Sequence, residues 1–298
     1  MLKIHRFSTQ KRREMWAAWL FLLPSLIGTF LFWIFPAIGS LGFSLFSWDM
    51  ISSPEFSGFK NFLELARDPV FRKALFNTLF YTVVSVPLAL AVSLGLALLM
   101  NRAIRGITIF RTLYFLPVVS SMVAVAIVWR WMLNKDYGVI NSFLSLFGLP
   151  AIDWLGSTTW AMPAVILMSI WKEIGYFMVI FLAGLQSLPR DLYEAAELEG
   201  ASSWQKFWRI TFPLLSPTTF FALIIALISA FQVFDQVYVM TEGGPSDATL
   251  TVVYYLYKQG FQYFRVGYAA TIALVLFLII MAVTLVQWFV TQKKVFYQ

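Results

Sequence analysis

The chain has 298 residues, of which 60% are hydrophobic and 12% charged, with a net charge of +7 and no cysteine. About a quarter of the residues of a water-soluble domain are charged, so this composition indicates a membrane protein. The lack of cysteine excludes disulfides, thiolate metal sites and a cysteine nucleophile. The single histidine, His5, lies in the polar N-terminal tail, so we expect neither histidine-based catalysis nor a multi-histidine metal site.

Six apolar stretches are long enough to cross a membrane, which takes about 20 helical residues. They are residues 16–46, 75–100, 113–133, 162–185, 218–240 and 269–290. We therefore predict an all-α polytopic membrane protein with six transmembrane helices. The first stretch is longer than a span requires and contains Pro24 and Pro36, so we expect it to kink or end near Pro36. It is also too long for the core of a signal peptide.

The lysines and arginines that flank these stretches predict the topology. Six spans place both termini on one side, and that side carries thirteen basic residues against seven on the other. Basic loops stay in the cytoplasm, so we expect both termini to be cytoplasmic. The predicted parts are a cytoplasmic tail at 1–15, a transmembrane domain at 16–292 with a cytoplasmic loop at 187–217, and a cytoplasmic tail at 293–298. The basic residues form no aromatic-interleaved patch, so we predict no nucleic-acid partner.

The cytoplasmic loop at 187–217 is predicted to fold as helix, turn, helix. Ser187 is suited to cap a first helix, and Gly200 can end that helix in a left-handed turn. Ser202 and Gln205 have the spacing of a capping box, which starts a second helix that we expect to break at Pro213.

Two functions fit such a loop. Ala195 and Ala196 lack bulk, so the first helix could fit into a cleft of another protein. Alternatively, the loop is an amphipathic connector on the membrane, with Trp204 and Trp208 as interfacial anchors. Anionic lipid would repel the three glutamates that lie within six residues here, but the residues alone leave the two functions about equally supported.

The loop resembles the Glu-Ala-Ala loop of ABC importer permeases. The matching residues are Glu194-Ala195-Ala196, Gly200 and Ile210-x-Phe212-Pro213, where the family pattern ends Ile-x-Leu-Pro. The resemblance extends through Thr241-Glu242-Gly243-Gly244-Pro245 and Ile170-Trp171. With the six-span plan it covers nearly the whole chain. It is closest to the carbohydrate-uptake permeases, specifically the first permease subunit for maltose or glycerol-3-phosphate.

This resemblance implies a permease subunit of an ATP-driven, binding-protein-dependent importer that works by alternating access. The implied partners are a second homologous permease, two copies of a cytoplasmic ABC ATPase, an extracytoplasmic solute-binding protein and a substrate that is a sugar or oligosaccharide. The implied location is the bacterial or archaeal cell (inner) membrane. ATP and Mg²⁺ would be bound by the ATPase, and this chain would hold no cofactor. The residues that would couple to the ATPase are Glu194, Ala195, Ala196, Gly200, Ile210 and Pro213.

Polar residues inside the predicted spans mark a candidate substrate pathway, because ionisable groups at membrane depth usually face a cavity or a partner. They are Lys172, Glu173 and Tyr176 in the fourth span, and Ser229, Gln232 and Asp235 in the fifth. Carboxylates and amides can hydrogen-bond sugar hydroxyls, while an aromatic ring packs on the apolar face of a pyranose. The resemblance implies a substrate-contacting tyrosine at Tyr176. Because the fifth span lacks the asparagines of the maltose relative, the residues determine neither which ligand is bound nor whether this subunit contains the binding site.

Structural roles for these charges were weighed as well. A direct Lys172–Asp235 ion pair is disfavoured, because the depths of the two residues differ by about 10 Å at 1.5 Å per helical residue. For Arg130, near the outer end of the third span, snorkelling to the interface is the favoured interpretation.

Two other classes of function were considered. Gly200-Ala201-Ser202-Ser203 is superficially like the motif of an intramembrane serine protease, but no histidine lies near it, so we predict that the chain is not an enzyme. It also has no phosphate loop for ATP hydrolysis. A stand-alone ion-coupled secondary transporter is the alternative, although no internal repeat is visible. The identity of the sugar or polyol is not determined by the sequence.

Overall fold

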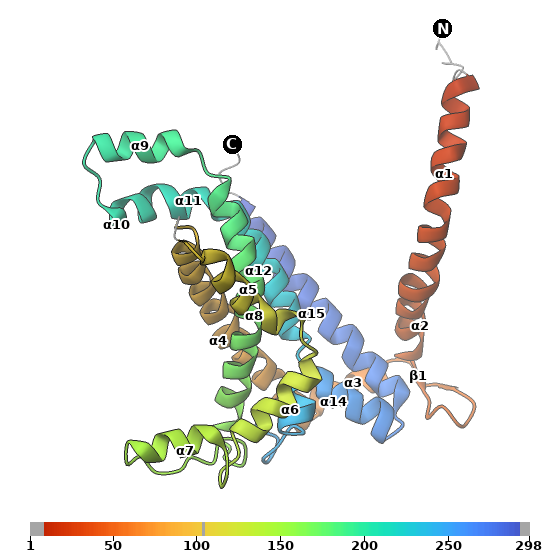
Figure 1. Ribbon diagram of the computed structural model, residues 1–298. Coiled ribbons are helices and arrows are strands. Elements are labelled where there is room, and N and C mark those ends of the chain that lie inside the picture. The colour runs from red at the N-terminus through yellow and green to blue at the C-terminus, as the bar shows by residue number, and fades with distance from the viewer. Residues whose placement is uncertain (1–8, 103–104, 293–298) are drawn as a thin grey trace. The chain divides into compact units, whose positions relative to one another are not determined.

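The structure, a computed structural model, describes residues 9–102 and 105–292 (Figure 1). Residues 1–8, which include His5, and the predicted C-terminal tail at 293–298 lie outside the described residues. The described chain is helical apart from one antiparallel pair of two-residue strands, β1 (Phe46–Ser47) and β2 (Glu55–Phe56). The prediction of a mostly helical, polytopic membrane protein is confirmed. The described residues form two compact units, one of 9–66 with 259–274 and the other of 67–102, 105–258 and 275–292.

The first unit contains the N-terminal helix, which is continuous through its two prolines. α1 (Thr9–Thr29) runs into a π-helical turn, η1 (Phe30–Ile34), and then into α2 (Phe35–Phe43). The helix does not end near Pro36, so that part of the expectation is wrong; a π-helical turn before Pro36 interrupts the α-helical pattern instead. The wider π turn, in which the Phe35 N–H donates to the Phe30 carbonyl, accommodates a proline that cannot donate a backbone hydrogen bond. Residues Lys11–Phe43 are therefore one candidate span.

The remaining elements follow in chain order. They are α3 (Lys60–Arg67), α4 (Pro69–Met100), α5 (Ile107–Val119), α6 (Met122–Met132), α7 (Val139–Leu146), α8 (Ala161–Gln186), α9 (Arg190–Leu198), α10 (Ser203–Lys206), the π turn η2 (Phe207–Thr211), α11 (Phe212–Leu214), α12 (Ser216–Phe231), α13 (Asp235–Met240), α14 (Val252–Tyr257), the π turn η3 (Lys258–Gln262) and α15 (Val266–Gln292).

The spans agree in part with the six predicted. Four helices are long and apolar enough to cross a membrane, and the number rises to six if two bent helix pairs each count as one span. The first, second, fourth and sixth predicted spans are continuous helices. The third is a pair, α5 and α6, bent by 99°, and the fifth ends at Phe231 instead of Met240.

The break between α5 and α6 is stabilised by a lysine from α8. Pro117, near the end of α5, removes one backbone donor. α5 ends at Val119, and Lys172 Nζ donates to carbonyls at this end: to Pro117 at 3.0 Å, Val118 at 3.3 Å and Ser120 at 2.9 Å. The Pro117 carbonyl also accepts from the Ser120 N–H at 3.2 Å. Backbone polar groups without partners cost several kcal/mol in a membrane, so the ammonium makes this sharp bend tolerable.

The break after α12 is stabilised in a similar way, by neutral side chains. Thr251 Oγ1 donates to the carbonyl of Val233 at 3.0 Å. Gln236, in the first turn of α13, is 5% exposed and donates to Tyr81 Oη at 3.1 Å and to Ser169 Oγ at 3.2 Å. These bonds tie α13 to α4 and α8, so the break belongs to the packed interior of the second unit.

The second unit is built around α8, which packs on α4 and α5. The packing is closest at Gly175, where an added Cβ atom would lie 2.0 Å from the carbonyl oxygen of Tyr114. Nearby, Ser93 Oγ on α4 donates to the Ile174 carbonyl at 3.0 Å. Asp68 begins α4 by accepting hydrogen bonds from the N–H groups of Val70 and Phe71, which satisfies two donors of the first turn.

Candidate functional site

The loop at 187–217 is a pair of helices that follows directly on α8. Figure 1 shows α9 and the segment from α10 to α11 side by side, beyond the adjacent ends of α8 and α12. The pair is held together by a hydrogen bond of 3.0 Å between the hydroxyls of Tyr193 and Thr211 and by an ion pair of 2.6 Å between Lys206 and Glu197. The predicted helix–turn–helix is therefore present.

The start of the first helix differs from the prediction. Ser187 does not cap α9, because it ends α8: its N–H donates to carbonyls of the last turn, and its Oγ donates to the Gly184 carbonyl at 2.8 Å. Pro189 is the residue before α9. A proline there fixes an extended backbone that separates two helices without a side-chain cap.

The turn between the two helices has the predicted chemistry. Gly200 has a φ of +76°, the left-handed conformation that favours glycine. The Ala201 N–H donates to the Ala196 carbonyl at 2.9 Å and the Gly200 N–H to the Glu197 carbonyl at 3.0 Å, the two bonds of a Schellman motif. The next helix then starts with the predicted capping box between Ser202 and Gln205, and both of its hydrogen bonds are formed.

The prediction that the second helix breaks at Pro213 is wrong. The π turn η2 precedes that proline, and helical structure continues to Leu214. The bend, of 65°, lies at Leu215, between 203–214 and α12. As at Pro36, a widened turn before the proline relieves the clash that its ring would make with the preceding turn.

The six predicted coupling residues all lie on this helix pair. Glu194, Ala195 and Gly200 are exposed, while Ala196, Ile210 and Pro213 are partly buried. On the second helix Trp204, Trp208 and the neighbouring Phe207 and Phe212 form an aromatic cluster with ring centroids 5.0–6.3 Å apart. The pair thus presents a polar first helix with small side chains and an aromatic second helix.

Four of the six predicted pathway residues line one hollow of about 210 Å³. They are Lys172, Glu173, Tyr176 and Ser229. The apolar part of the wall, which was not predicted, consists of Val118, Met122, Phe177 and Ile225. Apolar residues of this kind occur throughout the spans, so no sequence signal distinguishes them.

Gln232 and Asp235 do not line this hollow. The fifth predicted span does not continue past Phe231, so Asp235 lies on α13, beyond the break, and not on the helix that carries Ser229. Lys172 is not in an ion pair with Asp235, in keeping with the expectation from their depths, and it binds carbonyl groups instead. Arg130 donates to the Val239 carbonyl at 3.0 Å and lies 3.9 Å from Glu242.

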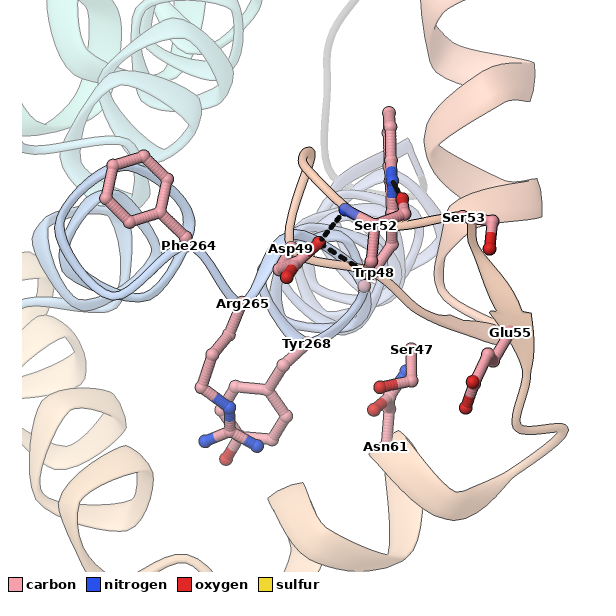
Figure 2. A pocket seen from close by; sticks show the side chains of 11 residues that line it. Ser47, Trp48, Asp49, Ser52, Ser53, Glu55, Asn61, Phe264, Arg265 and Tyr268 are labelled. Carbon is pink, nitrogen blue, oxygen red and sulfur yellow. Dashed lines mark hydrogen bonds between the residues drawn. The ribbon is translucent and has the colours of Figure 1, made fainter.

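A second hollow, of about 260 Å³, lies in the first unit and was not foreseen (Figure 2). Asp49 accepts hydrogen bonds from the Ser52 hydroxyl and N–H, each at 2.7 Å, and from the Ile51 N–H at 3.0 Å. These bonds, with that of the Ser52 hydroxyl foremost, lower the pKa of the Asp49 carboxyl to about 2. On the other wall, the Arg265 guanidinium lies 4.4 Å from the centre of the Tyr268 ring. The hollow is therefore polar, and it carries fixed charge of both signs.

Comparison with known proteins identifies the molecule. Residues 66–295 match the family described as the inner membrane component of binding-protein-dependent transport systems. The chain belongs to this family. It is an ABC transporter permease, a multi-pass inner membrane protein and not an enzyme.

Individual relatives of the permease match over nearly their whole length. A probable ABC transporter permease of Bacillus subtilis, YesP, is 38% identical, over 96% of this chain and 94% of its own. The lactose transport permease LacF of Rhizobium radiobacter is 37% identical, over 93% and 94% respectively. Among solved structures, a bacterial alginate ABC transporter in complex with an alginate-pentasaccharide-bound periplasmic protein contains a chain with a TM-score of 0.85 and 27% identity, over 95% of this chain and 96% of that one.

Proposed function

We propose that this permease forms part of the membrane pathway for a sugar or oligosaccharide, and that its loop at 187–217 couples it to a separate ATPase. The substrate class is supported by relatives named for lactose and alginate transport. The single observation that carries the coupling role is the helix pair at 190–214, joined by side-chain bonds, whose first helix exposes Glu194 and Ala195 beyond the end of α8.

In this proposal each coupling residue has a physical task. Glu194 meets a basic or polar group of the ATPase, and Ala195 and Ala196 allow close approach. Gly200 makes the turn that sets the first helix against the second, and Ile210 and Pro213 lie in the segment that joins the pair to α12. The aromatic cluster of the second helix fits contact with lipid, so the connector interpretation applies better to that helix than to α9.

The pathway is proposed to include the hollow lined by Lys172, Glu173, Tyr176 and Ser229, in which Lys172 supports the wall through its bonds at the helix break and the other three residues face the substrate. Helix breaks lie beside it, because Val118 and Met122 flank the break between α5 and α6, and Ser229 lies in the last turn of α12. Substrate sites of transporters are commonly built where helices are interrupted. Gln232 and Asp235 lie at the second break and remain proposed contacts further along the path.

The remaining parts of the assembly are also proposals. Both termini lie in the cytoplasm, as the tails at 1–15 and 293–298 around a permease domain at 16–292. The partners are a second homologous permease, two ATPase copies that bind ATP and Mg²⁺, and an extracytoplasmic binding protein. Substrate moves by alternating access, in which closure of the ATPase dimer draws the coupling helices together and opens the pathway outward.

Coupling is tested with Gly200→Leu and Glu194→Lys in the reconstituted transporter. Both variants should insert in the membrane but lose ATP-driven uptake. Gly148→Leu is a matched control, because Gly148 also has a positive φ, +68°, and open space around it, but lies in the turn after α7. Normal uptake by both loop variants would contradict the coupling role. Uptake driven by a pH gradient without an ATPase would support the alternative, a secondary transporter.

The pathway is tested by the apparent substrate affinity of Tyr176→Ala and Gln232→Ala. We expect weaker apparent affinity in both variants, with Tyr137→Ala, an exposed tyrosine outside the hollow, unchanged. If neither variant changes the apparent affinity while the complex still assembles, the proposed pathway is wrong.

A further inference from the structure

A basic hollow of about 650 Å³ lies between the base of the coupling helix pair and the adjacent ends of α4, α5 and α8. Three arginines line it: Arg102 after α4, Arg111 on α5 and Arg190 at the start of α9. No aspartate or glutamate is among the described residues that line it. The spacing of these arginines in the sequence gives no sign that they come together, so the hollow was not predicted.

The arginines are only partly used by the protein itself. Arg111 Nη2 donates to the Met100 carbonyl at 2.6 Å, while its Nε is buried and has no hydrogen-bond partner among the described residues. Three guanidinium groups without a neighbouring carboxylate fit an anion with several oxygens, and phosphate suits their forked geometry.

The rest of the wall indicates the remainder of the ligand. Leu98, Ile107, Leu185 and Leu188 line the same hollow as the arginines. A free inorganic phosphate would have no use for this apolar surface, whereas a phospholipid presents its phosphate to the arginines and its first acyl carbons to the leucines. Basic pockets between transmembrane helices at the cytoplasmic face are suited to anionic lipid headgroups. The volume also lies within the roughly 300–1,000 Å³ of small-molecule sites.

We propose that this hollow binds an anionic phospholipid through its phosphate. The bound lipid touches both sides of the hinge between α8 and α9, since Leu185 belongs to α8, and Arg190 and Tyr193 belong to α9. It would hold the coupling pair at a fixed angle to the membrane helices. The cytoplasmic position of the site rests on the topology proposed above, but binding itself does not, so it can be tested separately from uptake.

The test uses the full-length permease, purified in detergent and stripped of lipid, with bound ligands counted by native mass spectrometry. The probes are phosphatidylglycerol, phosphatidylethanolamine with the same acyl chains, and inorganic phosphate. We expect phosphatidylglycerol to be retained in preference to the other two. The double variant Arg102→Gln/Arg190→Gln should weaken its retention by roughly thirtyfold, as the loss of two arginine attractions at a membrane surface predicts.

Two controls keep the result interpretable. Arg209→Gln removes an exposed arginine of the same loop that does not line the hollow, and it should bind lipid as the wild type does. Arg102→Lys/Arg190→Lys keeps the charge and should restore most of the retention. Equal retention of lipid by the double glutamine variant would overturn the proposal. Retention of inorganic phosphate without any preference for lipid would overturn the proposal that the ligand is a lipid. Loss of uptake with lipid binding intact would concern only the proposed coupling to the ATPase.

Discussion

Lys172 could stabilise the fold at the α5–α6 break or bind the substrate, and the variant Lys172→Met distinguishes these two roles. Lys172 as a whole residue is 8% exposed, and its ammonium donates to three backbone carbonyls at the α5–α6 break. Three hydrogen bonds from a charged group, at about 1.5–3 kcal/mol each, give roughly 4–9 kcal/mol in gross terms. Removal of the lysine also ends the cost of desolvating its charge, which is several kcal/mol. We therefore expect a net loss of about 2–4 kcal/mol in the free energy of unfolding.

The measurement is thermal unfolding of the purified permease in detergent, together with uptake by the fraction that folds. Lys172→Met should lower the unfolding temperature by several degrees. The apparent substrate affinity of the folded transporter should stay within about twofold, whereas the loss of a substrate contact worth about 1.4 kcal/mol would weaken it tenfold. Lys73→Met is the control, because Lys73 is exposed on α4 and holds no helix break. An unchanged unfolding temperature with apparent affinity weakened tenfold or more would refute this reasoning and make Lys172 a substrate group.

Two further variants test the packing and the coupling pair. Gly175→Ala should lower the unfolding temperature and the membrane yield, because the new methyl group would lie 2.0 Å from the Tyr114 carbonyl oxygen. Overpacking of this kind costs about 1–3 kcal/mol. An unchanged unfolding temperature would show that α5 can move away. Ser202→Ala should destabilise the second coupling helix by about 0.5–2 kcal/mol through loss of its bond to the Gln205 N–H, measured as faster amide hydrogen exchange over 203–206, whereas Ser203→Ala should have little effect.

The parts of the fold that follow from composition and local chemistry were predictable. Spans such as 162–185 are apolar over the length of a bilayer, and the observed α8, Ala161–Gln186, differs from that prediction by one residue at each end. The turn at Gly200 and the capping box at Ser202 depend on residues within one helical turn of each other, so they too could be identified.

The breaks could not be predicted, because their stabilising partners are distant in the sequence. An apolar stretch from 113 to 133 has the composition of one helix, and only Lys172, more than fifty residues later, makes a 99° bend at Ser120 acceptable. Thr251 plays the same part for the carbonyl of Val233. The assignment of Gln232 and Asp235 to one continuous span with Ser229 fails for this reason, since helical periodicity holds only while the helix continues.

The proposed coupling has a direct mechanical route through the chain. α8 enters the loop and α12 leaves it, and both helices also line the candidate substrate hollow, α8 through Tyr176 and α12 through Ser229. Tyr176 lies ten residues before the end of α8, a distance of about 15 Å along a helix. Only the residues 187–189 separate α8 from the coupling helix α9, and Leu215 alone separates α11 from α12. A displacement of the helix pair by the ATPase would therefore reach the α8 and α12 walls of the hollow without passing through any other element. The 65° bend at Leu215 is the place where its direction can change.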